Sequence, residues 1–277
     1  MRFAFATCFN AEYQPGGLAL CRSIRKQYPD PSEAPIVAMI EERYCGDPLV
    51  PALKHLGVTV KQINVGPVVQ DKPYREPWLK AKAWVTRYAF EKYGADITVH
   101  IDADAFLLAP LDDVSPLLGD ADLLGMLDPG IALYEYDVLY GDGKPLKRLS
   151  AGDVRFNCGV LFWRNTAHAQ DALIHFCNAV NDGYRWAIGR HDQFLLHDLA
   201  GWLIESDRLV VKIPPHAIGQ HWNPVDKVAN NLKRQGNIWI NENTGKRQYI
   251  WHGVGSGLPW KDRVSDSVQA AFKWVSE

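Results

Sequence analysis

Short β-prone runs alternate with helical patterns over roughly the first hundred residues, and no other feature constrains the fold as strongly. Apolar residues at helical spacing fill the segments between these runs, and Gly94 follows the longest of them, where glycine commonly ends a helix. A polar loop is expected at 8–17. Repeated strand and helix units predict an α/β fold built on a parallel sheet. The four runs that we expect to form strands are 2–7, 35–40, 58–63 and 97–101.

The rest of the chain alternates less regularly. The segment 128–154 mixes Gly, Asp and Lys with tyrosines, which is typical of a substrate-facing loop rather than a packed element. The segment 214–257 is rich in Trp, Asn and Gly and shows no clear periodicity. We expect two more strands and two more helices, in the order strand, strand, helix, helix, at 121–127, 155–163, 167–180 and 191–199.

Composition favours one large domain and argues against nucleic acid as a partner. A chain of 277 residues, 47% of them hydrophobic, can bury one sizeable core, so we predict a single domain over residues 1–277. The 30 Lys and Arg residues nearly balance the 32 Asp and Glu residues, so there is no electrostatic case for nucleic acid as a partner. Five scattered cysteines without a C-x-x-C pair argue against a disulfide framework or a structural zinc site and favour a reducing compartment.

No segment has the character of a membrane anchor. The N-terminus lacks the apolar region of a signal peptide, and no run of about 18 apolar residues occurs. We therefore expect a soluble, cytoplasmic protein without a transmembrane segment. Peripheral contact with a membrane that carries a lipid acceptor stays compatible with this prediction.

Two aspartates, Asp102 and Asp104, follow the buried run 97–101 directly. Ligands of open α/β sheets collect at the carboxyl ends of strands. Carboxylates at positions i and i+2 can share a divalent cation while the small Ala103 between them points elsewhere. Such a cation stabilises the charge that develops when a diphosphate leaves. The alternative is that the aspartates cap the next element or lie solvated in a loop.

His252 lies much further along the chain, where an apolar run enters a Gly-rich stretch. A neutral imidazole beside two carboxylates makes a mixed nitrogen and oxygen site, which suits Mn²⁺ better than Ca²⁺. Glycines such as Gly253 and Gly255 would let the backbone approach a phosphate closely. A structural role for a histidine at the end of a strand is the alternative.

Five short motifs occur in one order along the chain, at 79–84, 99–104, 156–160, 191–193 and 252–260. Together they resemble the family 8 glycosyltransferases, the group that contains glycogenin and bacterial lipopolysaccharide galactosyltransferases. The segment 79–84 resembles the Lys-x-x-x-Trp helix of that family, and 99–104 resembles its D-x-D strand. Further along, 156–160 resembles its F-N-[AS]-G-V strand, 191–193 its D-Q helix start, and 252–260 its terminal H-x-x-G-x-x-K-P-W loop.

The resemblance implies a GT-A fold, which is a Rossmann-like domain with a mostly parallel, mixed sheet flanked by helices. Residues 1–104 would bind the nucleotide, and residues 105–277 the sugar and the acceptor. It further implies a nucleotide-sugar donor, from which a hexose is transferred with retention at the anomeric carbon to a glycan or glycolipid acceptor. The metal, Mn²⁺ with Mg²⁺ as the alternative, would be held by Asp102, Asp104 and His252.

The resemblance also implies roles for single residues. Asp192 and Gln193 would act at the transferred sugar. Asp192 could stabilise positive charge on the sugar, attack it as a nucleophile, or only cap the following helix, and a front-face reaction would need no nucleophile. Tyr13 offers an aromatic face for stacking, although a tyrosine there also suits a core-covering role. The residues expected to contact the donor are Thr7, Asn10, Tyr13, Lys80, Asp102, Ala103, Asn157, Cys158 and Gly255.

Two positions depart from the family pattern. Leu258 stands where the family has Lys before Pro-Trp, so a cation expected near the leaving pyrophosphate is missing there, and Lys261 or Arg263 would have to replace it. Cys8 stands near a position where the family often carries Asp in its base-binding loop. The resemblance favours UDP as the nucleotide, and the departure at Cys8 keeps GDP as the alternative.

Two other functions fit parts of the sequence. Haloacid-dehalogenase-like phosphatases also use a D-x-D after a buried strand, but they carry it at the first strand, and Ala105 stands where they usually have Thr or Val. A non-catalytic nucleotide-sugar-binding protein of the same fold is supported by Leu258, because loss of a phosphate cation lowers turnover more than binding. Against it stand the D-x-D, His252 and the Asp192-Gln193 pair.

Overall fold

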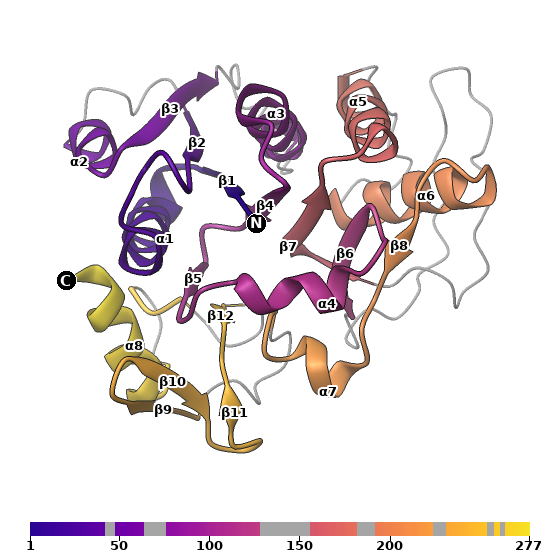
Figure 1. Ribbon diagram of the computed structural model, residues 1–277. Coiled ribbons are helices and arrows are strands. Elements are labelled where there is room, and N and C mark those ends of the chain that lie inside the picture. Colours follow the sequence, from indigo (N-terminus) through magenta and orange to yellow (C-terminus); the bar gives the residue numbers. More distant parts are fainter. Residues whose placement is uncertain are drawn as a thin grey trace.

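The computed structural model describes residues 1–41, 48–63, 76–127, 156–181, 192–223, 231–253, 258–260 and 264–277. A seven-stranded sheet lies at its centre, with the strand order β3-β2-β1-β4-β7-β6-β8 (Figure 1). Four strands from the first part of the chain run parallel: β1 (Phe3–Phe9), β2 (Ile36–Glu41), β3 (Val58–Ile63) and β4 (Ile97–Ile101). The other strands of this sheet are β6 (Leu123–Leu127), β7 (Phe156–Arg164) and β8 (Val211–Lys212).

The direction of β7 makes the sheet mixed. β7 runs antiparallel to both of its neighbours, β4 and β6, whereas β8 is parallel to β6. Every residue of β7 except the last is buried, as expected for a strand in the middle of a sheet that is covered on both faces. The predicted α/β class, with a mostly parallel, mixed sheet flanked by helices, is confirmed.

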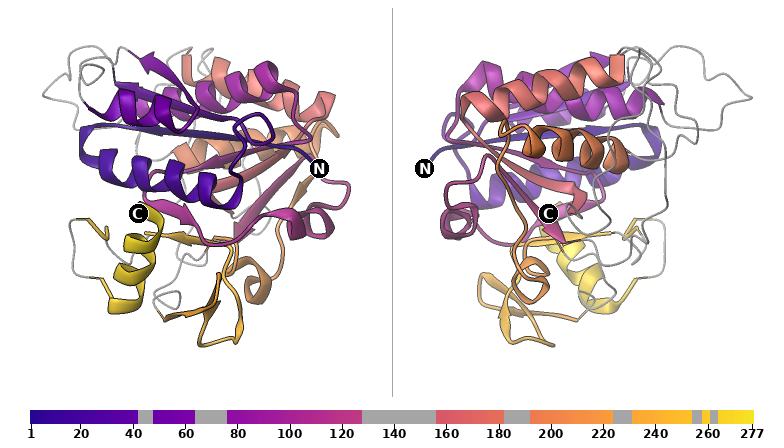
Figure 2. Two further views of the ribbon diagram at one scale, coloured as in Figure 1. Left: turned by 60° about the vertical axis from the view of Figure 1, so that its left-hand side comes forward. Right: turned by 90° about the vertical axis from the view of Figure 1, so that its right-hand side faces the viewer.

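Alternating side chains of β1 and β2 build a core on each face of the sheet. Phe3 and Phe5 pack with α1 (Gln14–Gln27) on one face, whereas Ala6 packs with α3 (Glu76–Tyr93) on the other. This period of two follows from the pleat of a strand. Each fully buried Phe contributes roughly 1.5–3 kcal/mol through the apolar surface it removes from water. The remaining long helices, α5 (Ala167–Asn181) and α6 (Asp192–Glu205), pack with α3 and β7 (Figure 2).

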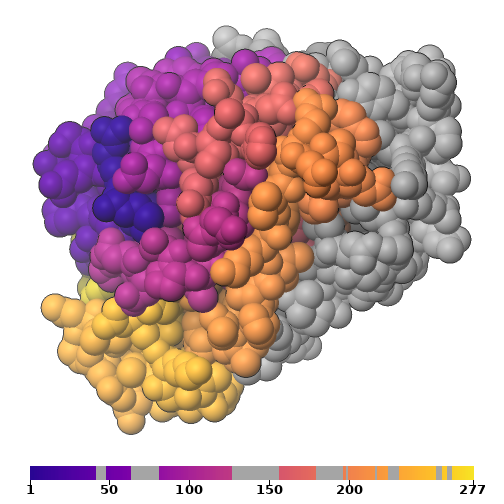
Figure 3. Space-filling view, turned by 45° about the vertical axis from the view of Figure 1, so that its right-hand side comes forward, coloured from indigo at the N-terminus to yellow at the C-terminus, as the bar shows by residue number. Residues whose placement is uncertain are grey.

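The C-terminal part of the chain forms a smaller layer against α1 and the segment after β4. In Figure 3 its yellow residues lie below the magenta residues that follow β4. A separate two-stranded ribbon joins the two layers, and Phe106 and Trp251 stack across it with ring centroids 4.9 Å apart. The elements of this layer are β5 (Ala105–Leu107), β9 (Leu232–Gln235), β10 (Ile238–Asn241), β11 (Lys246–Arg247), β12 (Ile250–His252) and α8 (Asp266–Ser276).

Five short helical elements complete the described residues. They are the 3-10 helices Ala11–Tyr13 and Asp112–Val114 and the short α-helices α2 (Leu49–His55), α4 (Ser115–Leu118) and α7 (His216–Gly219). None of the helices in the described ranges is both long and apolar enough to cross a membrane.

Two local predictions need correction. The polar loop expected at 8–17 is wrong, because β1 continues to Phe9 and helical structure begins at Ala11. Asn10 makes this possible, since its side-chain oxygen accepts a hydrogen bond from the Tyr13 backbone N–H at 3.2 Å and so caps the first turn. The helix predicted at 191–199 continues to Glu205. The loop expected at 128–154 lies outside the described residues.

Candidate functional site

Strand pairing brings His252 to the two aspartates. Asp102 follows the last residue of β4, and β5 begins immediately after Asp104. β12 pairs antiparallel with β5 in a register that places His252 opposite Ala105. The backbone N–H of Gly253 also donates to the carbonyl oxygen of Asp104 at 2.8 Å. A residue from near the C-terminus is thereby fixed beside the turn that follows β4.

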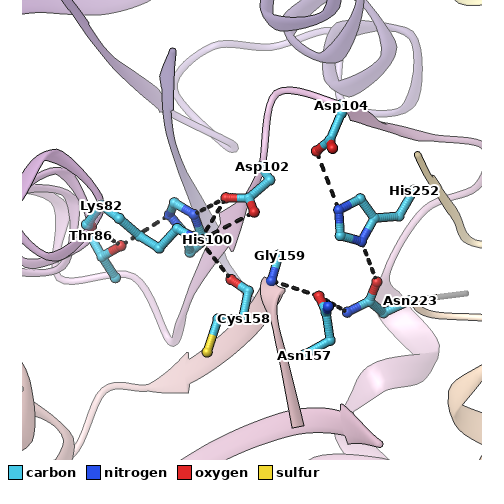
Figure 4. Close-up of polar contacts among 10 residues, drawn as sticks. All are labelled: Lys82, Thr86, His100, Asp102, Asp104, Asn157, Cys158, Gly159, Asn223 and His252. Carbon is cyan, nitrogen blue, oxygen red and sulfur yellow. Dashed lines mark hydrogen bonds and ion pairs between the residues drawn. The ribbon is translucent and has the colours of Figure 1, made fainter. Parts of the chain in front are cut away.

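The side chains of Asp102, Asp104 and His252 form a cluster that suits a divalent cation. One potential ligand atom from each residue lies within 4.8 Å of the others. Nε2 of His252 is 3.2 Å from Oδ1 of Asp104, a contact that is an ion pair when the ring is protonated (Figure 4). This buried nitrogen has no other polar partner among the described residues. Two carboxylates and an imidazole nitrogen are a ligand set that Mn²⁺ accepts. Within the described ranges, this is the one group of three or more such side chains.

The cluster is closed on one side and open on the other. The His252 side chain is 1% exposed, whereas those of Asp104 and Asp102 are 20% and 29% exposed. A cation held here would therefore keep coordination positions on the solvent side for water or for oxygens of a ligand. An open position of this kind distinguishes a catalytic metal site from a structural one.

Two basic residues hold Asp102. Nζ of Lys82, on α3, lies 3.0 Å from Oδ1 and 3.1 Å from Oδ2 of Asp102, and it also donates to the carbonyl oxygen of Cys158 at 3.3 Å. Nε2 of His100, the second-last residue of β4, lies 2.9 Å from Oδ1 of Asp102. Burial alone would raise the pKa of Asp102, but Lys82, His100 and His252 outweigh it and hold this pKa well below its usual range. Asp102 is therefore a carboxylate at neutral pH.

The pKa of His252 is set by the same competition. Burial of the imidazole lowers its pKa, whereas the nearby Asp104 and Asp102 carboxylates raise it, and the net shift is upward. The carboxylates thus attract positive charge to this position, which is the electrostatic condition for a cation site.

The N-terminal residues predicted to contact the donor lie at the carboxyl end of β1 and in the turn after it. Thr7 is buried in β1, and its hydroxyl has no hydrogen-bond partner among the residues that the structure describes. The side-chain oxygen of Asn10 is used as a helix cap. The ring of Tyr13 meets Trp260 edge to face, with centroids 6.1 Å apart. The indole nitrogen of Trp260 also donates to the carbonyl oxygen of Glu12 at 3.3 Å, so the terminal Pro-Trp segment reaches this turn.

Other predicted donor residues lie beside the cluster. Ala103 is buried in the turn after β4, and Cys158 is buried in β7 with its carbonyl oxygen facing Lys82. Asn157, also on β7, is buried, and its side chain takes part in hydrogen bonds that reach His252 (Figure 4).

Some predicted residues cannot be placed by their side chains. Gly255, Lys261 and Arg263 lie outside the described residues. Lys80 belongs to α3, and Asp192 and Gln193 are the first residues of α6, but only their backbone is described. Asp192 does stand at the start of a helix, as the sequence predicted.

The sequence did not identify three residues of this site: Lys82, His100 and Asn223. Lys82 lies on the buried side of α3 together with Thr86 and Phe90. A lysine is seldom buried without a charged partner, so its position at this spacing was a signal of a site that the sequence contained. His100 lies inside an apolar strand, which is a weaker signal of the same kind. Asn223 offers no comparable pattern, because only the folded chain brings it to His252.

The fold and the cluster together define the class: a GT-A-type α/β fold with a D-x-D turn and a histidine at the carboxyl edge of its sheet. Solved glycosyltransferases share this fold. An active-site mutant of LgtC covers 100% of this chain and is itself covered to 95%, with 18% identity and a TM-score of 0.57. The galactosyltransferase LgtC with donor and acceptor sugar analogues is similar at 17% identity and a TM-score of 0.51.

Two longer glycosyltransferases are similar over part of their length. GlyE of Streptococcus pneumoniae TIGR4 matches with 14% identity and a TM-score of 0.55, over 100% of this chain and 61% of GlyE. The bifunctional WbbM matches with 19% identity and a TM-score of 0.55, over 94% of this chain and 46% of WbbM. The chain thus spans about three fifths or less of these two proteins. No protein-family model matches the sequence, and no curated protein sequence matches it.

Proposed function

We propose that this chain is a metal-dependent glycosyltransferase that moves a hexose, with retention, from a nucleotide-diphosphate sugar to a glycan or glycolipid acceptor. A UDP-sugar is the favoured donor and a GDP-sugar the alternative. The observation that carries the proposal is the convergence of Asp102, Asp104 and His252 at the edge of the sheet where ligands of open α/β folds bind. Membership of glycosyltransferase family 8 is part of the proposal and rests on the order of the five motifs.

Each residue of the cluster has a role in this proposal. Asp102, Asp104 and His252 hold the cation, for which Mn²⁺ is favoured over Mg²⁺ because one of the ligands is an imidazole. A cation held by these residues would supply positive charge opposite the leaving diphosphate. Lys82 and His100 keep Asp102 ionised and oriented. The turn that contains Asn10 and Tyr13 receives the base and ribose, next to Trp260.

A non-catalytic nucleotide-sugar-binding protein is the second candidate. Leu258 favours it, because it stands where a lysine would contact the leaving pyrophosphate. A phosphatase of the haloacid-dehalogenase type is less well supported, because the D-x-D follows the fourth strand along the chain rather than the first. Transfer activity distinguishes the first two functions, and hydrolysis of a simple aryl phosphate would favour the third.

Replacement of Asp192 tests the catalytic part of the proposal. We expect Asp192→Asn to leave the affinity for nucleotide nearly unchanged while the transfer rate falls by roughly 10²-fold or more, because the amide can neither attack the sugar nor stabilise positive charge on it. Release of nucleotide from a panel of UDP- and GDP-sugars, with Mn²⁺, measures the rate.

The matched control for this variant is Asp207→Asn. Asp207 is an exposed residue in the turn just after α6, with a φ of 55°, a conformation that asparagine also adopts readily. We expect it to transfer as the parent chain does. Equal rates for Asp192→Asn and the parent would remove Asp192 from the catalytic residues, and an inverted anomeric configuration in the product, read by NMR, would contradict retention.

A further inference from the structure

Hydrogen bonds of fixed direction connect β7 to the imidazole of His252. This series of hydrogen bonds begins at the backbone N–H of Gly159, which donates to Oδ1 of Asn157 at 2.7 Å. Nδ2 of Asn223 donates to the same oxygen at 3.0 Å. Oδ1 of Asn223 lies 2.7 Å from Nδ1 of His252 (Figure 4). All three side chains are at least 95% buried, since Asn157, Asn223 and His252 are 5%, 1% and 1% exposed.

The first donor in this series of hydrogen bonds determines the direction of every later hydrogen bond. A backbone N–H can only donate, so the atom of Asn157 that faces Gly159 must be its oxygen. This oxygen can only accept, so Asn223 must present its NH₂ group to it. The oxygen of Asn223 therefore faces His252, and Nδ1 of His252 must carry the proton that it donates. The lone pair of the neutral ring is then on Nε2, the atom that faces Asp104.

Glycine at position 159 leaves the space for this arrangement. A Cβ atom at that position would lie 2.1 Å from Cε1 and 2.7 Å from Nε2 of His252, and 2.9 Å from Oδ1 of Asn157. These distances are too short for any side chain, so the imidazole lies directly against the backbone of β7. The same residue ties β7 to the metal turn, because its carbonyl oxygen accepts from the Asp102 N–H at 2.7 Å.

We propose that Asn157 and Asn223 form a positioning relay that holds His252 in its Nδ1–H tautomer and aims Nε2 at a divalent cation between Asp102 and Asp104. Asn223 is thus a positioning residue that acts on the metal through His252. The relay rests on the metal site of the proposed function and goes beyond it by naming the groups that prepare the histidine. Hydrogen bonds to the second nitrogen of a metal-bound histidine commonly serve this purpose.

Direct Mn²⁺ binding to the chain tests the relay without any assay of activity. Titration with Mn²⁺ alone, followed by the EPR signal of free Mn²⁺, gives the affinity of each variant. We expect Asn223→Ala to weaken binding roughly 10- to 100-fold, the usual effect of removing an outer partner of a metal-bound histidine. Asn223→Asp keeps an oxygen that accepts from Nδ1–H but loses the NH₂ group that donates to Asn157, so its Mn²⁺ affinity should lie between those of the parent and of Asn223→Ala.

The matched control is Asn241→Ala. Asn241 is an equally buried amide, on β10, and its side chain donates to Gln248 rather than to a residue of the metal cluster. Its loss should leave Mn²⁺ affinity at the parent value. Parent affinity for Asn223→Ala, or equal losses for Asn223→Ala and Asn223→Asp, would overturn the relay.

Histidine NMR gives a second measurement, in which the tautomer is read from the unchanged protein and a variant serves only to assign the signals. With ¹⁵N-labelled histidine and Zn²⁺ as a diamagnetic cation, the signals absent from His252→Asn belong to His252. We expect them to show a protonated Nδ1 and a metal-bound Nε2, and a protonated Nε2 would overturn the proposal.

The metal site and the relay fail in different ways. If the parent binds Mn²⁺, Asp104→Ala does not and Asn223→Ala binds normally, the site stands and only the relay is wrong. If the parent and Asp104→Ala bind equally, or neither binds, the metal site and the relay are both wrong.

Discussion

Asp102 is the residue on which the charges of the site converge. Removing a carboxylate from water is costly. Here Lys82 and His100 offset that cost, and the Asp102 side chain as a whole remains 29% exposed. The Lys82 ammonium is held in turn by the carbonyl oxygen of Cys158 on β7. The Asp102 carboxylate is thus kept ionised and in position without a cation.

Lys82→Met tests this balance. Without the ammonium, Asp102 loses one of the two basic side chains that bond to it directly, so we expect the free energy of unfolding in EDTA to fall by roughly 1.5–3 kcal/mol, the contribution typical of a hydrogen bond to a charged group. Mn²⁺ should recover part of this loss, because it supplies positive charge to the same carboxylate. Urea denaturation in EDTA and in Mn²⁺ measures both effects.

Lys92→Met is the control for this substitution. Lys92 is an exposed lysine in the last turn of the same helix, where it lies over the rings of Tyr88 and Tyr93. Its replacement should change the free energy of unfolding by no more than roughly 0.5 kcal/mol. If Lys82→Met were as stable as Lys92→Met in EDTA, Lys82 would not support Asp102.

At the scale of residues, the sequence singled out Asp102, Asp104 and His252, which the fold brings together, but not the residues that hold them in place. Asp102 and Asp104 follow a recognisable buried strand, and His252 stands at a change from apolar to Gly-rich sequence, so local pattern was enough to single them out. Lys82, His100 and Asn223 act only through residues distant in sequence. Their roles depend on the packing of α3, β7 and the turn after α7, which no local spacing reveals.

At the scale of elements, the start of α1 fits tightly against the metal turn. A Cβ atom at Gly16 would lie 2.1 Å from the carbonyl oxygen of Ala103 and 2.3 Å from the ring of Trp260. Glycine at this position therefore lets α1 contact both the D-x-D backbone and the terminal Pro-Trp segment. Close approach, rather than an unusual backbone angle, is what requires glycine here.

Gly16→Ala should force these elements apart. We expect a loss of roughly 1–3 kcal/mol in the free energy of unfolding, the usual cost of overpacking, together with weaker Mn²⁺ binding because Ala103 lies between the two aspartates. Thermal denaturation and a Mn²⁺ titration of the same variant measure both. In the control Gly219→Ala, the new methyl meets nothing closer than 3.5 Å, so stability should stay at or above that of the parent.

Elements with a strong local pattern were predicted well from the sequence. The strands at 58–63 and 97–101 agree with β3 and β4 residue for residue. The strands β5, β8, β11 and β12 were not predicted, because each has three residues or fewer and is defined by a partner elsewhere in the chain. The ribbon of β5 and β12 matters most, since it places His252.

At the scale of the whole molecule, the site lies where the central sheet meets the C-terminal layer. β4 and β7 supply one side of it, and the ribbon of β5 and β12 supplies the other. The predicted division into a nucleotide-binding part at 1–104 and a sugar- and acceptor-binding part at 105–277 stays a prediction. The boundary does fall within the metal cluster, so both parts would contribute ligands to one cation.

Nucleotide binding that depends on both metal and Asp104 is the most direct test of the proposed function. We would measure the thermal midpoint of the parent and of Asp104→Ala with UDP, GDP and CDP, each in Mn²⁺ and in EDTA. A ligand at about 100 times its dissociation constant adds roughly 2.7 kcal/mol, enough to raise the midpoint by roughly five to ten degrees. We predict such a rise for one nucleotide, UDP in the first place, only for the parent and only with Mn²⁺. A rise of the same size in Asp104→Ala or in EDTA, or no rise with any nucleotide, would contradict a metal-dependent nucleotide site in this protein.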